Sequence, residues 1–85
     1  MGRAGRALKE ALATYGLSQN KLAVTMGVER TVVYRWVHEL VDPTGETIVE
    51  VVRGLNQLDP DAAKAFIALY LIPVLNEDRD DYDDP

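Results

Sequence analysis

Apolar residues recur at helical spacing in five segments of the 85-residue chain, and no segment alternates apolar and polar residues as a strand does. The pattern therefore predicts an all-α fold, a compact bundle of five helices. In chain order, the apolar positions that define these helices are Leu8, Ala11, Leu12 and Tyr15; Leu22, Ala23 and Met26; Val32, Val33, Trp36, Val37 and Leu40; Ile48, Val51, Val52, Leu55 and Leu58; and the apolar run of residues 65–72.

Capping residues mark where several of these helices begin. Ser18, Thr44 and Asp59 precede the second, fourth and fifth apolar stripes, and their side-chain oxygens can accept the free N–H groups of a first helical turn. Pro60 then occupies the first position of the fifth helix, where its missing N–H costs nothing.

The two ends of the chain are expected to lie outside the bundle. Residues 1–6 hold two glycines and two arginines and predict a flexible N-terminal arm, mobile or only partly helical, with the first helix running from about residue 4 or 6 to Tyr15. The fifth helix is expected to end near residue 72, before Pro73. Residues 76–85 carry six acidic side chains and predict a disordered acidic tail, so the domain is expected to span residues 1–75.

Residues 17–36 predict two short helices joined by a tight turn, a helix-turn-helix over about residues 18–40. Gly27 stands at the turn, where a residue just past a helix end often needs a positive φ. Val28 follows it as an apolar plug. Trp36 lies on the apolar side of the second helix and is expected to be buried. The side chains left facing outward are Arg30, Thr31, Tyr34 and Arg35.

These features resemble the lambda repressor and Cro-like helix-turn-helix family, also called the XRE family. Its usual run is Gly-Leu-Ser-Gln, two variable residues, Leu-Ala, and a Gly-Val turn before an amphipathic recognition helix. The resemblance covers about residues 8–58 and implies a sequence-specific transcriptional regulator with its third helix in the major groove of double-stranded DNA. The matching positions are Gly16, Leu17, Ser18, Gln19, Leu22, Ala23, Gly27, Val28 and Trp36.

The resemblance also implies roles for individual residues. Gln19 is expected to contact a phosphate and to brace the recognition helix. Arg30 and Thr31 are expected to meet base edges, Arg30 on guanine and Thr31 on a thymine methyl group. Tyr34 follows one turn further along. The residues better placed for phosphates are Lys21 and Arg35. The alternative is that the whole set is a solvated surface.

Arg3 and Arg6 in the expected arm supply a second candidate contact. Arginines on a mobile leader can reach into a minor groove, as they do in several helix-turn-helix proteins. The alternative is that both are ordinary solvated residues.

Three acidic residues occupy positions where the family pattern has other types of residue. Glu29 replaces the usual small cap before the recognition helix, and Glu39 and Asp42 follow that helix in a loop that often meets phosphate. The recognition helix is therefore expected to run a little further than usual, and DNA affinity is expected to be modest and sensitive to salt.

Charge is divided unevenly along the chain, whose formal net charge is −5. Residues 1–36 hold six basic and two acidic side chains, a balance of +4. Residues 37–75 have a balance of −4, and residues 76–85 one of −5. The positive charge thus lies on the segment expected to face DNA.

An uncharged run over residues 65–74 predicts a dimer. A helix of a small domain buries one face in its own core, and this one is apolar nearly all round. An isologous homodimer would present two recognition helices to a palindromic operator. The alternative is that the chain from Asn76 onward folds back over the surface. The expected interface residues are Phe66, Ile67, Tyr70, Leu71 and Val74.

The remaining composition excludes several classes of function. The chain has no cysteine and a single histidine, His38, so neither an enzyme active site nor a metal site is expected, and no cofactor is implied. No apolar run is long enough to span a membrane, and a cytoplasmic protein, associated with the nucleoid when bound to DNA, is expected. The alternative function is a helix-turn-helix domain that binds another protein, as an antitoxin does, through its fifth helix and acidic half.

Overall fold

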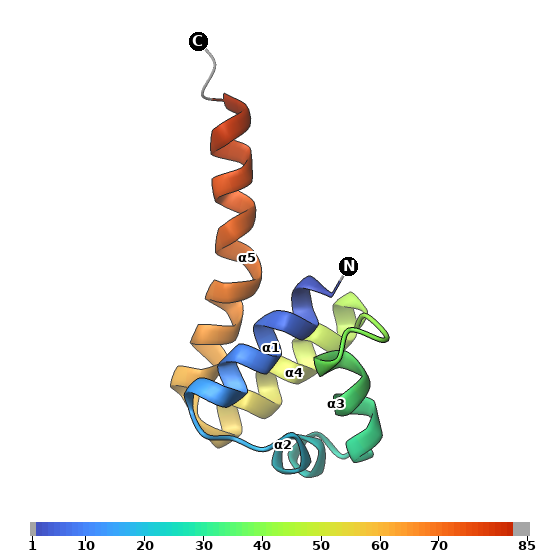
Figure 1. Cartoon of the computed structure of the whole chain (residues 1–85). Helices are drawn as coiled ribbons and strands as arrows, with labels where there is room; N and C mark the ends of the chain where they lie inside the picture. The colour runs from blue at the N-terminus through green and yellow to red at the C-terminus, as the bar shows by residue number, and fades with distance from the viewer. Residues whose placement is uncertain (1, 83–85) are drawn as a thin grey trace.

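The described part of the chain forms five helices, in the order that the apolar pattern predicts (Figure 1). The computed structural model describes residues 2–82, and for residues 78–82 only the backbone. The helices are α1 (Arg3–Thr14), α2 (Gln19–Met26), α3 (Arg30–Val37), α4 (Gly45–Leu58) and α5 (Pro60–Tyr82). This part of the chain contains no strand, which confirms the all-α prediction.

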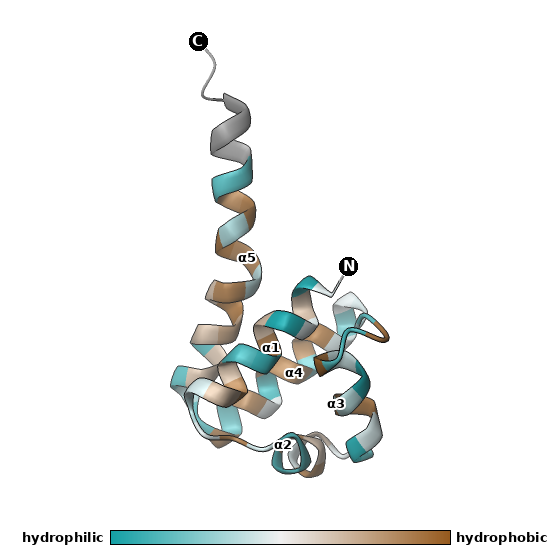
Figure 2. Cartoon of the chain, viewed as in Figure 1, coloured by the Kyte–Doolittle hydropathy of each residue, from teal (hydrophilic) through white to brown (hydrophobic). Residues whose placement is uncertain are grey.

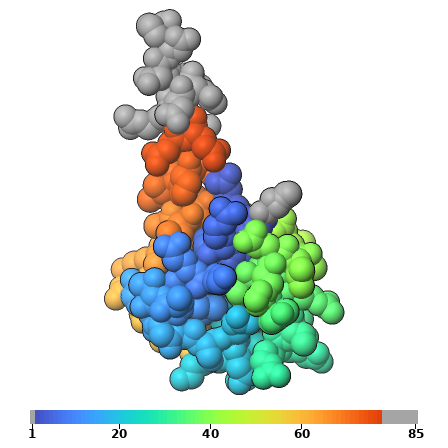
Figure 3. All heavy atoms as spheres, in the orientation of Figure 1, coloured from blue at the N-terminus to red at the C-terminus, as the bar shows by residue number. Residues whose placement is uncertain are grey.

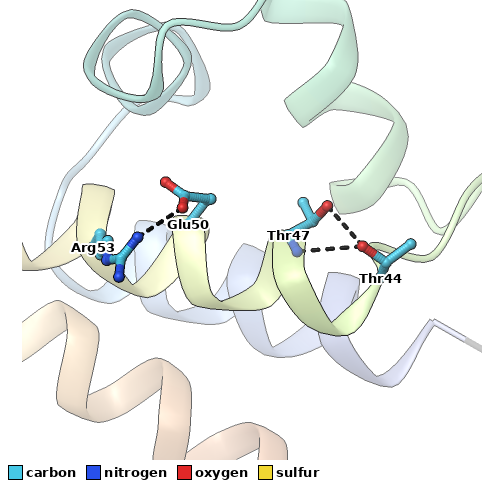
Figure 4. Close-up of polar contacts among 4 residues, drawn as sticks. All are labelled: Thr44, Thr47, Glu50 and Arg53. Carbon is cyan, nitrogen blue, oxygen red and sulfur yellow. Dashed lines mark hydrogen bonds and ion pairs between the residues drawn. The ribbon is translucent and has the colours of Figure 1, made fainter.

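Side-chain caps begin three helices at the predicted residues. Ser18 and Thr44 each accept the backbone N–H three residues further on, at 2.9 and 3.3 Å. Asp59 accepts the N–H two residues on, at 3.0 Å. Figure 4 shows the Thr44 cap at the start of α4, with the ion pair between Glu50 and Arg53, 2.8 Å apart, further along the same helix.

The core lies where α1, α4 and α5 meet the helix-turn-helix. Here α5 packs on α1 and α4, α2 packs on α3 and α4, and α3 packs on α1. Trp36 is only 6% exposed, as predicted. Tyr15, predicted to be buried, is 37% exposed, because α1 ends at the preceding residue and Tyr15 no longer follows its apolar stripe. The largest fully buried side chains are Phe66, Leu8, Leu22, Leu55, Val33 and Val51.

The segment expected as a flexible or partly helical arm is helical from Arg3, the first residue of α1, with Gly2 at the N-cap; Met1 lies outside the described residues. Ala4 and Gly5 are buried, and the N–H of Gly2 donates to Asp42 Oδ1 at 3.1 Å. A side chain at Gly5 would overlap the carbonyl oxygen of Trp36. The backbone of α1 therefore packs directly on the end of α3, and this packing holds the segment in a helical conformation.

The prediction that α5 ends near residue 72 is wrong, because the helix continues past Pro73 to Tyr82. Proline inside a helix removes one backbone hydrogen bond. The turn after it is tied to α1, since Arg3 Nη2 lies 3.2 Å from Glu77 Oε2. Part of the expected acidic tail, residues 83–85, lies outside the described residues. None of the helices described is both long and apolar enough to cross a bilayer.

The close approach of α1 to α3 predicts that Gly5→Ala destabilises the fold. The added methyl group has to displace the Trp36 carbonyl, and we expect a loss of about 1–3 kcal/mol in the free energy of unfolding. Gly45→Ala is the matched control, because it adds the same group to the start of α4 where no atom lies within 4 Å. That variant is expected to be unchanged or more stable by up to about 1 kcal/mol. Urea denaturation measures both, and equal midpoints would contradict the packing described.

Candidate nucleic-acid interface

The turn between α2 and α3 is held by backbone hydrogen bonds around a glycine. Gly27 has φ +76°, and its N–H donates to the carbonyl of Val24 at 3.1 Å. The next N–H, of Val28, donates to the carbonyl of Ala23 at 3.0 Å. This pair of bonds is the Schellman arrangement, which satisfies the last carbonyls of a helix. Val28 packs against the core as the predicted plug. The turn thus fixes the orientation of α3 relative to α2.

One face of α3 is buried and the opposite face is open. Val33, Trp36 and Val37 point into the core. The four residues predicted to face outward are all exposed: Arg30, Thr31, Tyr34 and Arg35. Two cationic side chains, a hydroxyl group and a phenol therefore share the open side of a single helix, a set that can donate to phosphates and to base edges.

The start of α2 lies beside this open helix. Lys21 is exposed, and Gln19 is half-buried. Gln19 lines a shallow groove together with Leu12 and Val37, so its side chain lies next to the last turn of α3. This position is compatible with the bracing role that the family resemblance implies for Gln19.

His38 belongs to the same surface, although the sequence analysis assigns it no part in DNA binding. Its ring lies over Tyr34, with centroids 4.1 Å apart and planes inclined by 36°. The contact orients the half-exposed Tyr34 ring along the helix surface. The signal was available in the sequence, because residues four positions apart on a helix are neighbours.

The recognition helix ends earlier than predicted, at Val37. Glu39 has φ +61°, a conformation that normally favours glycine. The N–H groups of Glu39 and Leu40 donate to the carbonyls of Trp36 and Arg35, at 3.0 and 2.9 Å, which closes the helix in a second Schellman arrangement. Leu40, predicted to lie on the buried stripe, is consequently 67% exposed.

The two carboxylates after α3 are turned toward α1. Glu39 Oε2 lies 3.9 Å from Arg6 Nε, and Asp42 accepts the N–H of Gly2. Glu29, at the N-cap of α3, makes no side-chain capping bond and is exposed. Of the three acidic departures from the family pattern, only Glu29 therefore stands without a described partner beside the open face.

Arg3 and Arg6 are not carried on a mobile arm. Both lie in the first turns of α1, where Arg3 pairs with Glu77 of α5 and Arg6 with Glu39. Their side chains remain partly exposed, so these ion pairs contribute little to stability. The structure brings them to α5 and to the end of α3, and this corrects the expectation of arginines that reach around DNA from a flexible leader.

The predicted dimer residues divide between core and surface. Phe66 is 1% exposed and stacks on Tyr70, so it belongs to the domain's own core and its assignment to an interface is corrected. Tyr70 and Val74 are half-buried, whereas Ile67 and Leu71 are exposed. Two further exposed apolar residues follow on α5, Ile72 and Leu75.

Within the described residues there is no group of three or more potential metal ligands.

Comparison with protein families places the region just described in a known group. The family model described as helix-turn-helix matches residues 8–62, which is more than half of the chain. The match begins within α1, contains α2, α3 and α4, and ends in the first turn of α5. Comparison with curated proteins and comparison with solved structures gave no match.

The positive φ of Glu39 predicts that Glu39→Gly stabilises the protein relative to Glu39→Ala. Both variants lose the contact with Arg6, but only glycine relieves the left-handed conformation, and we expect a difference of about 1 kcal/mol in unfolding free energy. Thermal unfolding followed by circular dichroism compares them. An alanine variant as stable as the glycine variant would contradict the described end of α3.

Proposed function

Because the chain belongs to the helix-turn-helix family of the lambda repressor-like type, we propose that it is a transcriptional regulator, of the repressor type, that reads a specific DNA sequence through α3. The observation that carries this proposal is the division of α3 into a buried apolar face and an open polar face. A helix divided in this way can enter a major groove while the rest of the domain keeps it in place.

In this proposal, the residues in the first half of the open face of α3 contact the bases. Arg30 stands at the first position of α3, and its guanidinium can donate twice to the O6 and N7 atoms of a guanine. Thr31 offers a methyl group to thymine and a hydroxyl group to either strand. Tyr34, held by His38, lies one turn later and can extend the reading by a further base. Each such contact is worth about 1–3 kcal/mol of discrimination.

In the same proposal, residues on α2 and near the end of α3 bind the DNA phosphates. Lys21 and Arg35 are exposed cations near the two ends of the motif, and Gln19 lies at the first position of α2. The engagement of Glu39 and Asp42 with α1 lessens the repulsion expected from the sequence. A small set of cations gives modest affinity, which a dimer can raise by doubling the contacts.

A second candidate function is supported by the exposed apolar residues of α5. Ile67, Leu71 and Leu75 are exposed on α5, a helix that continues to Tyr82. In this alternative the domain binds another protein through α5, as an antitoxin binds its toxin, and DNA binding is secondary or absent.

Selection of bound sequences from random duplex DNA tests the regulator proposal. We expect one sequence to be enriched, and we expect Arg30→Ala combined with Thr31→Ala to weaken binding to it about 10- to 100-fold, with a smaller loss on unrelated DNA. Arg53→Ala is the matched control, because it removes an exposed arginine from α4. That variant is expected to keep the sequence preference.

Salt titration separates phosphate contacts from base contacts in the same experiment. Lys21→Ala is expected to weaken binding to all sequences alike and to lower the slope of log affinity against log salt by about one. No binding by the wild-type protein at low salt would overturn the proposal and favour the protein-binding alternative.

A further inference from the structure

The end of α3 places a fixed cation beside the single histidine of the chain. Arg35 lies in the last turn of α3, His38 is its C-cap residue, and both side chains are exposed. Residues three positions apart on a helix are neighbours, so these two side chains share one corner of the surface. Figure 3 shows the atoms of this segment, in green, on the outer surface of the molecule beside those of α1.

The His38 ring is held in this corner by Tyr34. The two ring centroids lie 4.1 Å apart, and the backbone N–H of His38 donates to the carbonyl of Tyr34 at 3.0 Å. A stack of this kind covers one face of an imidazole and leaves its two nitrogens at the ring edge. Protonation gives the ring a positive charge and a second N–H donor, and the face of an aromatic ring attracts such a cation.

The carboxylates that follow His38 in the chain are engaged elsewhere. Glu39 Oε2 lies 3.9 Å from Arg6 Nε, and Asp42 accepts the N–H of Gly2. Among residues 2–77 His38 forms no ion pair. Figure 2 shows hydrophilic colour on α1 and on the loop after α3. The charged side chains on the two helices that pack against α3 are Arg3, Arg6, Lys9 and Glu10 of α1 and Lys21 of α2.

Most of the charges around this corner are therefore positive, and they favour an anion from outside the chain. Lys9 is exposed and lines a shallow groove next to Val37, the residue before His38. The carboxyl end of a helix itself carries a partial negative charge, which repels a phosphate unless cations offset it. Arg35 supplies one such cation at every pH, and His38 supplies a second one only when it is protonated.

We propose that Arg35 and His38 bind one DNA phosphate between them, and that His38 takes up a proton from the solvent as this contact forms. The inference rests on the proposed function, in which the first turn of α3 meets base edges. From Arg30 to His38 the helix extends about 12 Å, which is close to the width of the major groove. The end of α3 then lies at the wall of the groove, where the phosphates are.

Proton uptake makes DNA affinity depend on pH. An ordinary imidazole changes its charge between about pH 8 and pH 5. A phosphate beside the ring favours the charged form, and by reciprocity the charged form binds the phosphate more tightly by the same factor. In the free protein both side chains of the corner are in water, which screens their charges. The affinity for DNA is therefore expected to rise as the pH falls.

Binding of the enriched duplex at about pH 6 and about pH 8, at constant ionic strength, tests the proposal. We expect the wild-type protein to bind about 3- to 10-fold more tightly at the lower pH, with a slope of log affinity against log salt that is steeper by up to about one. His38→Gln is expected to bind at both pH values as weakly as the wild type does at the higher one. His38→Lys is expected to bind tightly at both.

A matched control separates the position of the histidine from its presence. Asn56→His, made in the His38→Gln protein, adds an imidazole at an exposed position of α4 and is not expected to restore the pH dependence. Other groups that titrate in this range remain in every variant. A loss of affinity that came only from a disturbed helix end would be equal at the two pH values.

Calorimetry of binding in two buffers of different ionisation enthalpy counts the protons directly. Near neutral pH we expect the wild-type protein to take up a fraction of one proton more than His38→Gln does on binding the same duplex. The shared phosphate has its own readout at the lower pH. Arg35→Ala combined with His38→Gln is expected to lose less affinity than the sum of the two single variants, because both residues hold the same group. Additive losses would contradict a shared phosphate.

The inference and the proposed function fail in different ways. A sequence-specific complex whose affinity is the same at both pH values would overturn proton uptake and leave the regulator proposal standing. A pH dependence that His38→Gln retains in full would do the same. No binding to any duplex at low salt, at either pH, would overturn both.

Discussion

The fold depends on the burial of one face of α3. Val33, Trp36 and Val37 lie against α1 and α2, and their transfer from water stabilises the domain and fixes the orientation of α3 together. The opposite face is left free for the same reason, because an eight-residue helix at the edge of a small bundle has neighbours on one side only. Stability and the candidate DNA surface thus come from a single packing arrangement.

Much of this structure can be predicted because it depends on interactions between residues close in the sequence. The caps at Ser18, Thr44 and Asp59 and the glycine turn at Gly27 depend on backbone groups within a few residues, and each lies where the sequence indicates. The apolar period predicts which side of α3 is buried, and therefore which residues are open. Their contacts with DNA remain a proposal, since exposure alone does not establish a partner.

The features that sequence reasoning missed depend on contacts between distant segments. Gly2 and Asp42, which join the start of α1 to the loop after α3, are 40 positions apart, and Arg3 and Glu77 are 74 apart. No pattern among residues close in the sequence predicts such pairs. Glu39 is a related case, because the sequence offers no glycine to end α3, and the left-handed residue occurs where α1 packs against the helix end.

The central claim is that the open face of α3 is the surface that meets DNA, and amide chemical shifts in a ¹⁵N-labelled protein test it most directly. Addition of the enriched duplex is predicted to shift the resonances of residues 18–21 and 29–35 most strongly and to leave those of residues 46–58 in α4 nearly unchanged. Shifts concentrated on α4 or α5, with α3 unchanged, would contradict the account.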